Sequence, residues 1–313
     1  MKTYVLEGTL TALSSISHNG GDSFGINSKL RREKVIQPDG QVEQVPLLSG
    51  NGLRGMLRDR GMLHMCHMLG YGTEAEGLPL NAFHFLFSGG ALTSKAGRGL
   101  DIDYARRLQR TIPLVGVFGG AIGNMIIPGK IKIGKALPIC QETAHLIPAT
   151  FAARATVSVW DYLQEEMYTR KDDSKDERNR PLLSASARQL LDTEQRATSL
   201  TPVEETGQKQ QMRYYVETFG AGTPFFWRIT LTDVEDVEFA ALLTTLVEFS
   251  RAPYVGGKSN IGLGEVAVQF QSWICIDSRV QPQSQEIDVP VNMVYHDHLR
   301  ANADAIRTIL EAM

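Results

Sequence analysis

The chain has 313 residues, of which 42% are hydrophobic and 21% charged, so it can bury a full core as an ordinary globular protein. Its formal net charge of −3 argues against a protein that coats nucleic acid through bulk charge. Its three cysteines form no Cys-x-x-Cys pair, which indicates neither a disulfide framework nor a zinc ribbon. No apolar run reaches about 18 residues and the start follows a strand pattern, so we expect a cytoplasmic protein without a membrane partner.

The first predicted element is a strand over residues 3–13, where apolar side chains alternate with glutamate and threonine. Residues 14–44 are rich in glycine and polar side chains, so we predict a long loop there, and such loops are often functional. This loop contains His18 and Asn19. It also contains a basic cluster, which consists of Lys29, Arg31, Arg32 and Lys34. Such a cluster forms an electrostatic track only where it converges in space with other basic residues.

A helix is predicted next, from about residue 50 to residue 69, with Ser49 as its N-cap. Arg54 and Arg58 are four residues apart on this helix, so both guanidinium groups are expected to project from one face. The competing interpretation is a solvated basic edge that binds nothing.

Two histidine motifs resemble metal sites but are better explained otherwise. The first lies on the predicted helix and consists of His64, Cys66 and His67. Neighbours on a helix point in different directions, and no carboxylate stands nearby in the sequence to complete the shell. The second is His296-Asp297-His298, in which Asp297 is expected to cap a last helix over residues 299–312. We therefore expect no metal ion and no cofactor.

The centre of the chain is predicted to hold insertions. Residues 70–110 are rich in glycine and partly helical, and residues 112–138 indicate a turn, a glycine-rich loop and a strand with outward-facing lysines. Residues 164–181 carry mixed charges and are too polar to bury, so we expect them to be exposed or mobile. Residues 184–212 are polar as well, and we expect this segment to project from the body.

The last part of the chain is predicted to contain a strand, a helix, a loop and a strand. Alternating apolar residues indicate a strand over residues 225–231, and an apolar stripe indicates a helix over residues 236–251. The connection over residues 253–266 holds four glycines, which allow successive backbone N–H groups to face an anion such as phosphate. A final strand begins at Val266.

Residues 252–259 satisfy the loose form of a nucleotide-binding P-loop, with Gly257-Lys258-Ser259 at the end. A P-loop needs a strand before it and a helix after it, because the helix N-terminus holds the phosphate. Here the predicted order is reversed. An NTPase is therefore the weaker hypothesis, and a glycine-rich connection without a ligand is a further alternative.

Without the insertions, the predicted order is strand, helix, strand, strand, helix, strand. This is the ferredoxin-like βαββαβ unit, so the predicted class is α+β. The same sheet is the framework of the RRM, which binds RNA. Since a fold alone does not give a function, the sites must decide.

Four stretches of the chain can be compared together with known families. They are residues 48–58, residues 117–133 with their two glycine-containing motifs, residues 217–229 with Gly222-Thr223 and Phe225, and residues 256–266. Together they resemble one family, the RAMP superfamily, and within it the backbone subunit of CRISPR effector complexes (the "Cas seven" family). They occur in the family's order and span nearly the whole chain. The long first loop and the negative net charge look most like the type IV member.

The resemblance implies one elaborated palm domain over residues 1–313, ferredoxin-like, with helical fingers inserted at about 70–130. It further implies a β-hairpin thumb within about 165–215, placed at 184–215, and a C-terminal extension at about 277–313. Leu200 or Met212 is expected to separate RNA bases at the thumb. The implied partners are a guide CRISPR RNA, the target DNA or RNA that pairs with it, further copies of the chain, and other effector subunits including a capping subunit and a helicase.

The resemblance also implies positions that bind RNA. In the family, basic residues of the first helix and the glycine loop contact phosphates. Where the family loop often has an arginine, this chain has Ile261. The residues expected to bind RNA are His18, Asn19, Lys29, Arg31, Arg32, Ser49, Asn51, Arg54, Arg58, Met212, Arg213, Gly256, Gly257, Lys258, Ser259 and Asn260.

Relatives that cleave RNA carry a catalytic aspartate in the loop after the first strand. By its spacing from residues 46–49, that position falls near Arg32 and Glu33, where this chain has no aspartate. We therefore predict a subunit that is not an enzyme. Asp22 and Asp39 lie in the same loop but off the matching position, and a metal-dependent ribonuclease that uses Asp22 is the alternative.

Overall fold

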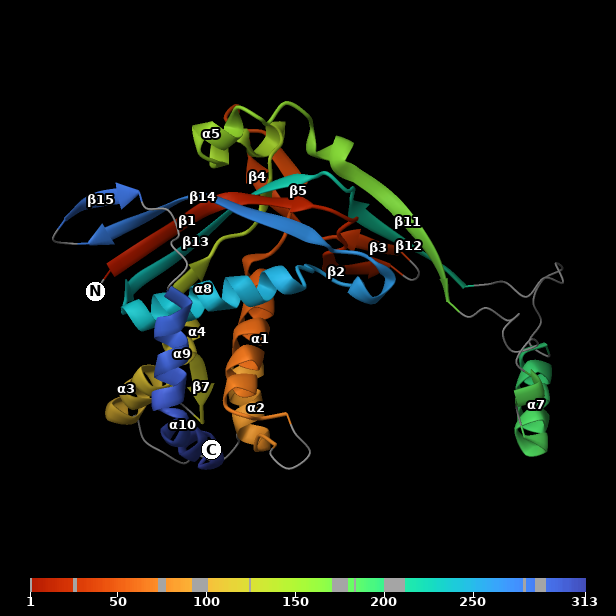
Figure 1. Cartoon of the computed structure of the whole chain (residues 1–313). Coiled ribbons are helices and arrows are strands. Elements are labelled where there is room, and N and C mark those ends of the chain that lie inside the picture. Colours follow the sequence, from red (N-terminus) through yellow and green to blue (C-terminus); the bar gives the residue numbers. More distant parts are fainter. Residues whose placement is uncertain are drawn as a thin grey trace.

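The computed structural model describes residues 2–24, 27–72, 77–91, 101–123, 125–170, 180–182, 184–199, 212–277, 280–284 and 291–313. Its central sheet has the strand order β10-β13-β1-β14-β15, and β9 also pairs with β13 (Figure 1). All of these pairs are antiparallel. The predicted α+β class is confirmed. The strands are β1 (Lys2–Ala12), β9 (Ile131–Ile133), β10 (Leu137–Pro138), β13 (Pro224–Val234), β14 (Val266–Asp277) and β15 (Val280–Ser284).

Strand β1 is the centre of this sheet, as its alternating sequence suggests. Leu6 lies opposite Ile229 of β13 on one side and opposite Trp273 of β14 on the other. Apolar side chains of β1 and β13 are buried, among them Leu10 and Trp227, which are both fully covered. The predicted strands over residues 3–13 and 225–231 are thus confirmed, because burying one face of each strand removes its apolar side chains from water.

Two helices, α1 (Gly50–Met68) and α8 (Asp236–Arg251), lie on one side of the sheet in Figure 1, where α8 runs along the strands and α1 points away from them. Both confirm the predicted spans within one residue, and Ser49 caps α1 by accepting a hydrogen bond from the N–H of Gly52. The apolar stripe of α8 includes the buried Phe239. Val247, which the periodicity places on the same stripe, is 41% exposed, so that part of the prediction is wrong.

The inserted region combines α2 (Leu80–Phe87), α3 (Ile102–Thr111) and α4 (Pro113–Phe118) with the short strands β6 (Gly90–Ala91), β7 (Gly120–Ile122) and β8 (Met125–Ile127). The turn predicted at its end is instead helix α4, which begins with a proline at N1 and is fully buried. Lys130 does not face solvent as expected. Its ammonium pairs with the buried carboxylate of Glu238 at 2.6 Å and so ties the insertion to α8.

A small second core covers the opposite side of the sheet. Phe226 of β13 packs there with Ile139, Ile147 and Phe151. The covering segments follow β10 and consist of η1 (Gln141–Leu146), α5 (Ala149–Ala152) and η2 (Val159–Tyr162). Both faces of β13 are therefore buried at this point, which explains why Phe225 and Phe226 are buried side by side.

The long loop predicted over residues 14–44 is wrong. The segment forms β2 (Asn19–Phe24), β3 (Asn27–Leu30) and β4 (Arg32–Ile36), and β4 pairs with β5 (Val42–Pro46). Val35 and Val45 are buried beneath this hairpin, whereas the basic side chains alternate with them. Strands β3 and β4 each bury a single apolar side chain, and their other positions are exposed or half-buried. The polar and glycine-rich composition therefore concealed the strands in the sequence.

A second hairpin leaves the body as β11 (Leu163–Arg170) and β12 (Met212–Phe219), and β12 also pairs in parallel with β3. Helix α7 (Ala185–Ser199) lies beyond the end of this hairpin in Figure 1, after the turn η3 (Arg180–Leu182). The hairpin arms therefore start and end outside the predicted 184–215, and residues 185–199 are helical. Residues 164–170 form a strand rather than a mobile run, while residues 171–179 and 200–211, including Leu200, lie outside the described residues.

The C-terminal helices α9 (Val291–Ala301) and α10 (Ala303–Glu311) pack onto the body, with α9 against α8 and α1. Asp297 lies inside α9 and pairs with Arg300 at 3.2 Å, so its expected role as a helix cap is wrong. The break between the helices falls instead at Asn302, whose side chain donates to the carbonyl oxygen of His298. Within the described residues, every helix is too short or too polar to cross a bilayer.

Candidate functional site

The glycine loop is attached to the segment that follows β1. The N–H of Gly257 donates to the carbonyl oxygen of Ser17 at 2.8 Å, and Gly264 donates to Ser15 at 2.8 Å. Gly256 has a backbone φ of +76°, and a Cβ built on it would stand 2.2 Å from the oxygen of Ser17. Only glycine fits this close approach, so the loop needs Gly256 to reach β1.

His18 connects the same segment to the start of α1. The backbone N–H of Ser49 donates to His18 Nε2 at 3.0 Å, and the Ser49 hydroxyl lies 3.0 Å from the same nitrogen. Because Nε2 accepts the backbone hydrogen bond, the neutral ring carries its proton on Nδ1. Burial lowers the pKa of His18, and the charge of Arg31 lowers it further. The neutral ring therefore links the segment between β1 and β2 to the N-terminus of α1.

Three backbone segments thus meet around the N-terminus of α1, namely residues 17–19, residues 49–52 and residues 256–257. The first turn of α1 has no acidic residue, so the positive end of the helix dipole is not compensated within the helix. Asn51 is exposed in this turn. The exposed Arg31 is tied to the first of the three segments, because its backbone N–H donates to the carbonyl oxygen of His18 at 2.8 Å. The arrangement suits an anion.

The middle of the glycine loop, at Lys258, is held by a side-chain contact. Lys258 adopts a backbone φ of +66° and starts the short turn η4 (Ser259–Ile261), in which Ser259, Asn260 and Ile261 are exposed. The Lys258 ammonium donates to the hydroxyl oxygen of Tyr168 at 2.5 Å. Sequence reasoning did not single out Tyr168, because nothing in the order of residues pairs position 168 with position 258.

The four residues of the basic cluster have two different environments in the structure. Lys29, Arg31 and Lys34 are exposed. Arg32 forms an ion pair with Glu217, and its guanidinium lies 5.4 Å from the centroid of the Trp160 ring. It therefore joins β4 to β12 and η2. Three of the four cations remain available to a ligand from solvent.

Arg54 and Arg58 point from one face of α1 as expected, but the inserted region covers that face. Arg58 is only 4% exposed, and its guanidinium donates to the carbonyl oxygens of Leu86 at 2.6 Å and Gly119 at 2.7 Å. Arg54 donates to the carbonyl oxygen of Phe118. The two arginines lie where α2 and α4 end, and cations are favoured at helix C-termini because the last carbonyls there lack partners.

The remaining expected positions have simple settings. Asn19 begins β2 and accepts a hydrogen bond from the Ser17 hydroxyl at 3.1 Å. Met212 and Arg213 begin β12, opposite Arg170 and Thr169, and their side chains lie outside the described part of the structure. Asp22 lies in β2, and its side chain is likewise outside the described part.

The positions weighed for catalysis do not converge on a described site. Asp39 is in the β4–β5 turn, where it accepts a hydrogen bond from the N–H of Gln41. Glu33 pairs with Lys135, a partner from β9–β10 rather than from its own cluster. The glycine loop follows a helix and precedes a strand, which is the opposite of the P-loop order.

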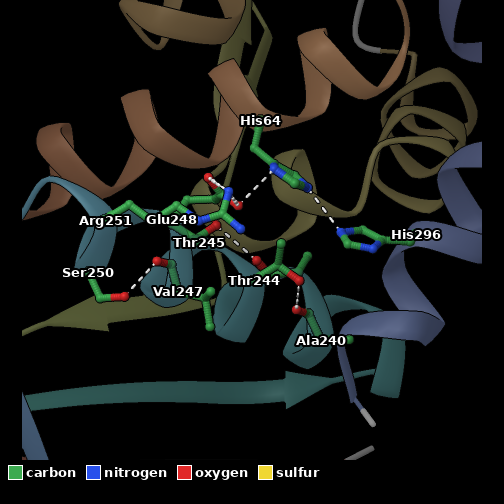
Figure 2. A network of polar contacts seen from close by, with 10 residues as sticks. His64, Ala240, Thr244, Thr245, Val247, Glu248, Ser250, Arg251 and His296 are labelled. Carbon is green, nitrogen blue, oxygen red and sulfur yellow. Dashed lines mark hydrogen bonds and ion pairs between the residues drawn. The ribbon is translucent and has the colours of Figure 1, made fainter. Parts of the chain in front are cut away.

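The histidine motif on α1 has a carboxylate neighbour after all. His64 Nδ1 lies 3.1 Å from Glu248 of α8, and His64 Nε2 lies 3.0 Å from His296 Nε2 of α9 (Figure 2). The sequence argument missed this carboxylate, because Glu248 is distant from His64 along the chain and adjacent to it in the fold. His64 stands between the two partners, so they do not converge on one point, and among the described residues no cluster of three or more such groups is arranged to hold a metal ion.

No family model and no curated protein sequence matches the chain. A solved structure does. One chain of a structure described as "Type IV-B CRISPR Complex" aligns over 93% of this chain and 96% of its own length, with a TM-score of 0.57 and 22% identity. The chain therefore shares its fold with that protein over nearly its whole length.

Proposed function

We propose that the chain is a non-catalytic backbone subunit of a CRISPR effector complex, of the RAMP superfamily and most similar to the type IV member. In this proposal it binds guide RNA, associates with further copies along that RNA, and presents the guide for pairing with target nucleic acid. Other effector subunits, including a capping subunit and a helicase, complete the proposed set of partners. The fold shared with a chain of a type IV-B CRISPR complex supports this choice.

The strand order supports a ferredoxin-like palm as the core of this subunit. Apart from the insertions, the chain order is β1, α1, β9 and β10, β13, α8, β14, and β1 lies between β13 and β14 with both neighbours antiparallel. This corresponds to the βαββαβ unit. In this view the insertion around α2 to α4 provides the fingers, and the β11–β12 hairpin provides the thumb.

The observation that carries the RNA-binding proposal is the meeting of the glycine loop with the N-terminus of α1. Backbone N–H groups, an uncompensated helix dipole and the exposed Arg31 favour a phosphate group there. The exposed Lys29 and Lys34 extend the basic surface along β3 and β4. Because each feature acts on phosphate, the proposed binding does not depend on base sequence.

The test is purification of the chain expressed with a guide RNA, followed by absorbance, mass and nuclease-protection measurements. We expect co-purified RNA protected in regular segments, in particles that contain several copies of the chain. Wild-type protein that carries no RNA and binds none when titrated would refute the proposal.

The alternative is a metal-dependent ribonuclease that uses Asp22. Assembled complex should be incubated with labelled complementary RNA, and separately with DNA, in magnesium and in manganese. We expect intact strands, since a metal-assisted cut needs a carboxylate beside the scissile phosphate and Glu33 is already paired with Lys135. Regular cuts that disappear in Asp22→Ala would establish the ribonuclease instead.

A further inference from the structure

Lys258 holds an unfavourable backbone conformation within the glycine loop. Its φ of +66° is in the left-handed region, which disfavours a residue with a Cβ. A conformation of this kind persists only where surrounding contacts determine it. The contacts on the backbone are the hydrogen bonds that the Lys258 carbonyl oxygen accepts from Ile261 at 3.1 Å and Leu263 at 3.4 Å. The side-chain Nζ lies 2.5 Å from the hydroxyl oxygen of Tyr168 and 4.4 Å from the centroid of its ring.

The hydrogen bond is the main part of this contact, because the ammonium is much closer to the hydroxyl oxygen than to the ring centre. Hydrogen bonds with an ionised donor are stronger than neutral ones. The interaction therefore fixes where the Lys258 charge stands relative to the loop.

Tyr168 is itself held by the hairpin and not by the loop. It lies on β11 directly opposite Tyr214 of β12, and the two half-buried rings stack with centroids 5.3 Å apart and planes 14° apart. Directly opposite aromatic pairs stabilise antiparallel strands. The position of the Tyr168 hydroxyl is thus set by the β11–β12 hairpin, which in turn orients Lys258.

The chemistry of the pair leaves hydrogen-bond donors to spare. A tyrosine hydroxyl that accepts from an ammonium still has its own hydrogen to donate, and the ammonium has two further hydrogens. These donors stand beside Gly257, the preceding residue, whose backbone N–H is held against Ser17. Three such donor hydrogens fit the anionic oxygens of a phosphate, which only accept hydrogen bonds.

We propose that Tyr168 is a further phosphate-binding residue, which orients Lys258 and donates its hydroxyl hydrogen to the same phosphate group. This inference rests on the proposed RNA-binding function and makes strand β11 part of the RNA site. The glycine loop and the β11–β12 hairpin then bind the RNA backbone together, so the phosphate bound at Lys258 also contacts the hairpin.

The experiment compares wild-type protein with Tyr168→Phe, Lys258→Asn and the double variant. Tyr168→Phe keeps the ring and its stacking on Tyr214, and asparagine tolerates the left-handed backbone at position 258. Tyr215→Phe is the matched control, because the neighbouring tyrosine on β12 points to the other face of the hairpin. The measurement is the affinity for a single-stranded RNA over a range of salt concentrations, with thermal unfolding recorded for each variant.

We expect Tyr168→Phe to weaken RNA binding roughly tenfold, as the loss of hydrogen bonds to charged groups does, with unfolding temperature unchanged. Lys258→Asn should lower the salt slope by about one. The double variant should bind more weakly than Lys258→Asn alone, but by less than the product of the two single effects, since part of the Tyr168 contribution acts through Lys258. Tyr215→Phe should bind as the wild type does.

Three results would overturn the inference while leaving the proposed function intact. The first is Tyr168→Phe binding RNA as well as the wild type. The second is tighter binding, which would mean that Tyr168 withholds Lys258 from RNA. The third is fully independent effects of the two substitutions. Wild-type protein that does not bind RNA at all would overturn both the inference and the function on which it rests.

Discussion

The guanidinium of Arg58 on α1 donates to the carbonyl oxygen of Gly119, 61 residues later in the chain, at 2.7 Å. The same group reaches the carbonyl oxygens of Leu86 at 2.6 Å and Phe85 at 3.2 Å, so one buried cation closes the ends of both α2 and α4. Burial lowers the pKa of Arg58 to about 10, and the neighbouring charge of Arg54 adds to this. The side chain remains a cation at neutral pH and holds the inserted region against α1 through these hydrogen bonds.

Arg58→Ala is therefore expected to destabilise the fold, by about 3 kcal/mol or more, because it leaves buried carbonyl groups without partners. Chemical denaturation would measure the free energy of unfolding. Arg106→Ala is the matched control, since that side chain is 66% exposed in its ion pair and should change stability by less than about 0.5 kcal/mol. If Arg58→Ala unfolds at the same denaturant concentration as the control, the fastening role is wrong.

Gly256→Ala should damage the loop more than a left-handed conformation alone explains. A Cβ at this position meets the Ser17 oxygen at 2.2 Å, whereas Gly40, with a similar φ of +86°, has open space around its Cβ. We expect Gly40→Ala to cost about 1 kcal/mol from strain alone, and Gly256→Ala to cost more and to weaken RNA binding. Equal losses of stability in the two variants, with RNA affinity retained, would show that the close approach is unimportant.

The exposed cations of β3 and β4 are expected to contact phosphate groups. Replacing Lys29 and Arg31 by alanine should weaken binding for all RNA sequences alike and reduce the slope of log affinity against log salt by about one unit per lost contact. Arg106→Ala again serves as the control, because it removes an exposed cation elsewhere. An unchanged slope in the folded double variant would place the RNA on another surface.

Stability is predicted to fall in mild acid. Burial lowers the pKa of His64, the charges of His296, Arg251 and His67 lower it further, and Glu248 opposes them. The folded state therefore disfavours the proton that the unfolded chain accepts near 6.5, and the stability present above that pH is lost as the pH falls below it. Burial lowers the pKa of His18 in the same direction.

The test of this pH dependence is the unfolding free energy between pH 8 and pH 5 for the wild type and for His64→Gln. The variant should show the shallower decline, because one of the groups that binds a proton on unfolding is gone. Parallel curves would mean that His64 does not contribute.

Much of the central sheet and its helices could be predicted from periodicity. The strands around Leu6 and Trp227 and helix α8 each bury one regular face, and such patterns depend on local sequence alone. The strands over residues 19–36 were missed. On β4, for example, Val35 is the one buried apolar position and most of the other residues are polar, so no alternating pattern is visible in the sequence. The start of the β11–β12 hairpin was predicted too late in the chain for a related reason. Strand β11 is partly exposed and carries charged residues, so it shows no clear alternation of apolar side chains.

The candidate site was predicted in part. The glycine loop and Ser49 were identified from residue types with local preferences, and both lie at the meeting point of the three segments. Arg58 and Tyr168 were assigned wrongly or not at all, because their partners are 61 and 90 residues away and no local pattern encodes those distances. Spacing on a helix places two arginines on one face but does not say what covers that face.

The position of β1 between β13 and β14 has a consequence for synthesis of the chain. Its neighbours start at Pro224 and Val266, so the first strand leaves the ribosome long before either partner exists. At roughly 5–20 residues per second, that interval is on the order of tens of seconds. The backbone contact between Ser17 and Gly257 can form only after residue 257 has been made, so the three segments around the N-terminus of α1 come together late in synthesis. Under the proposed function, a shorter chain therefore has no assembled site for RNA.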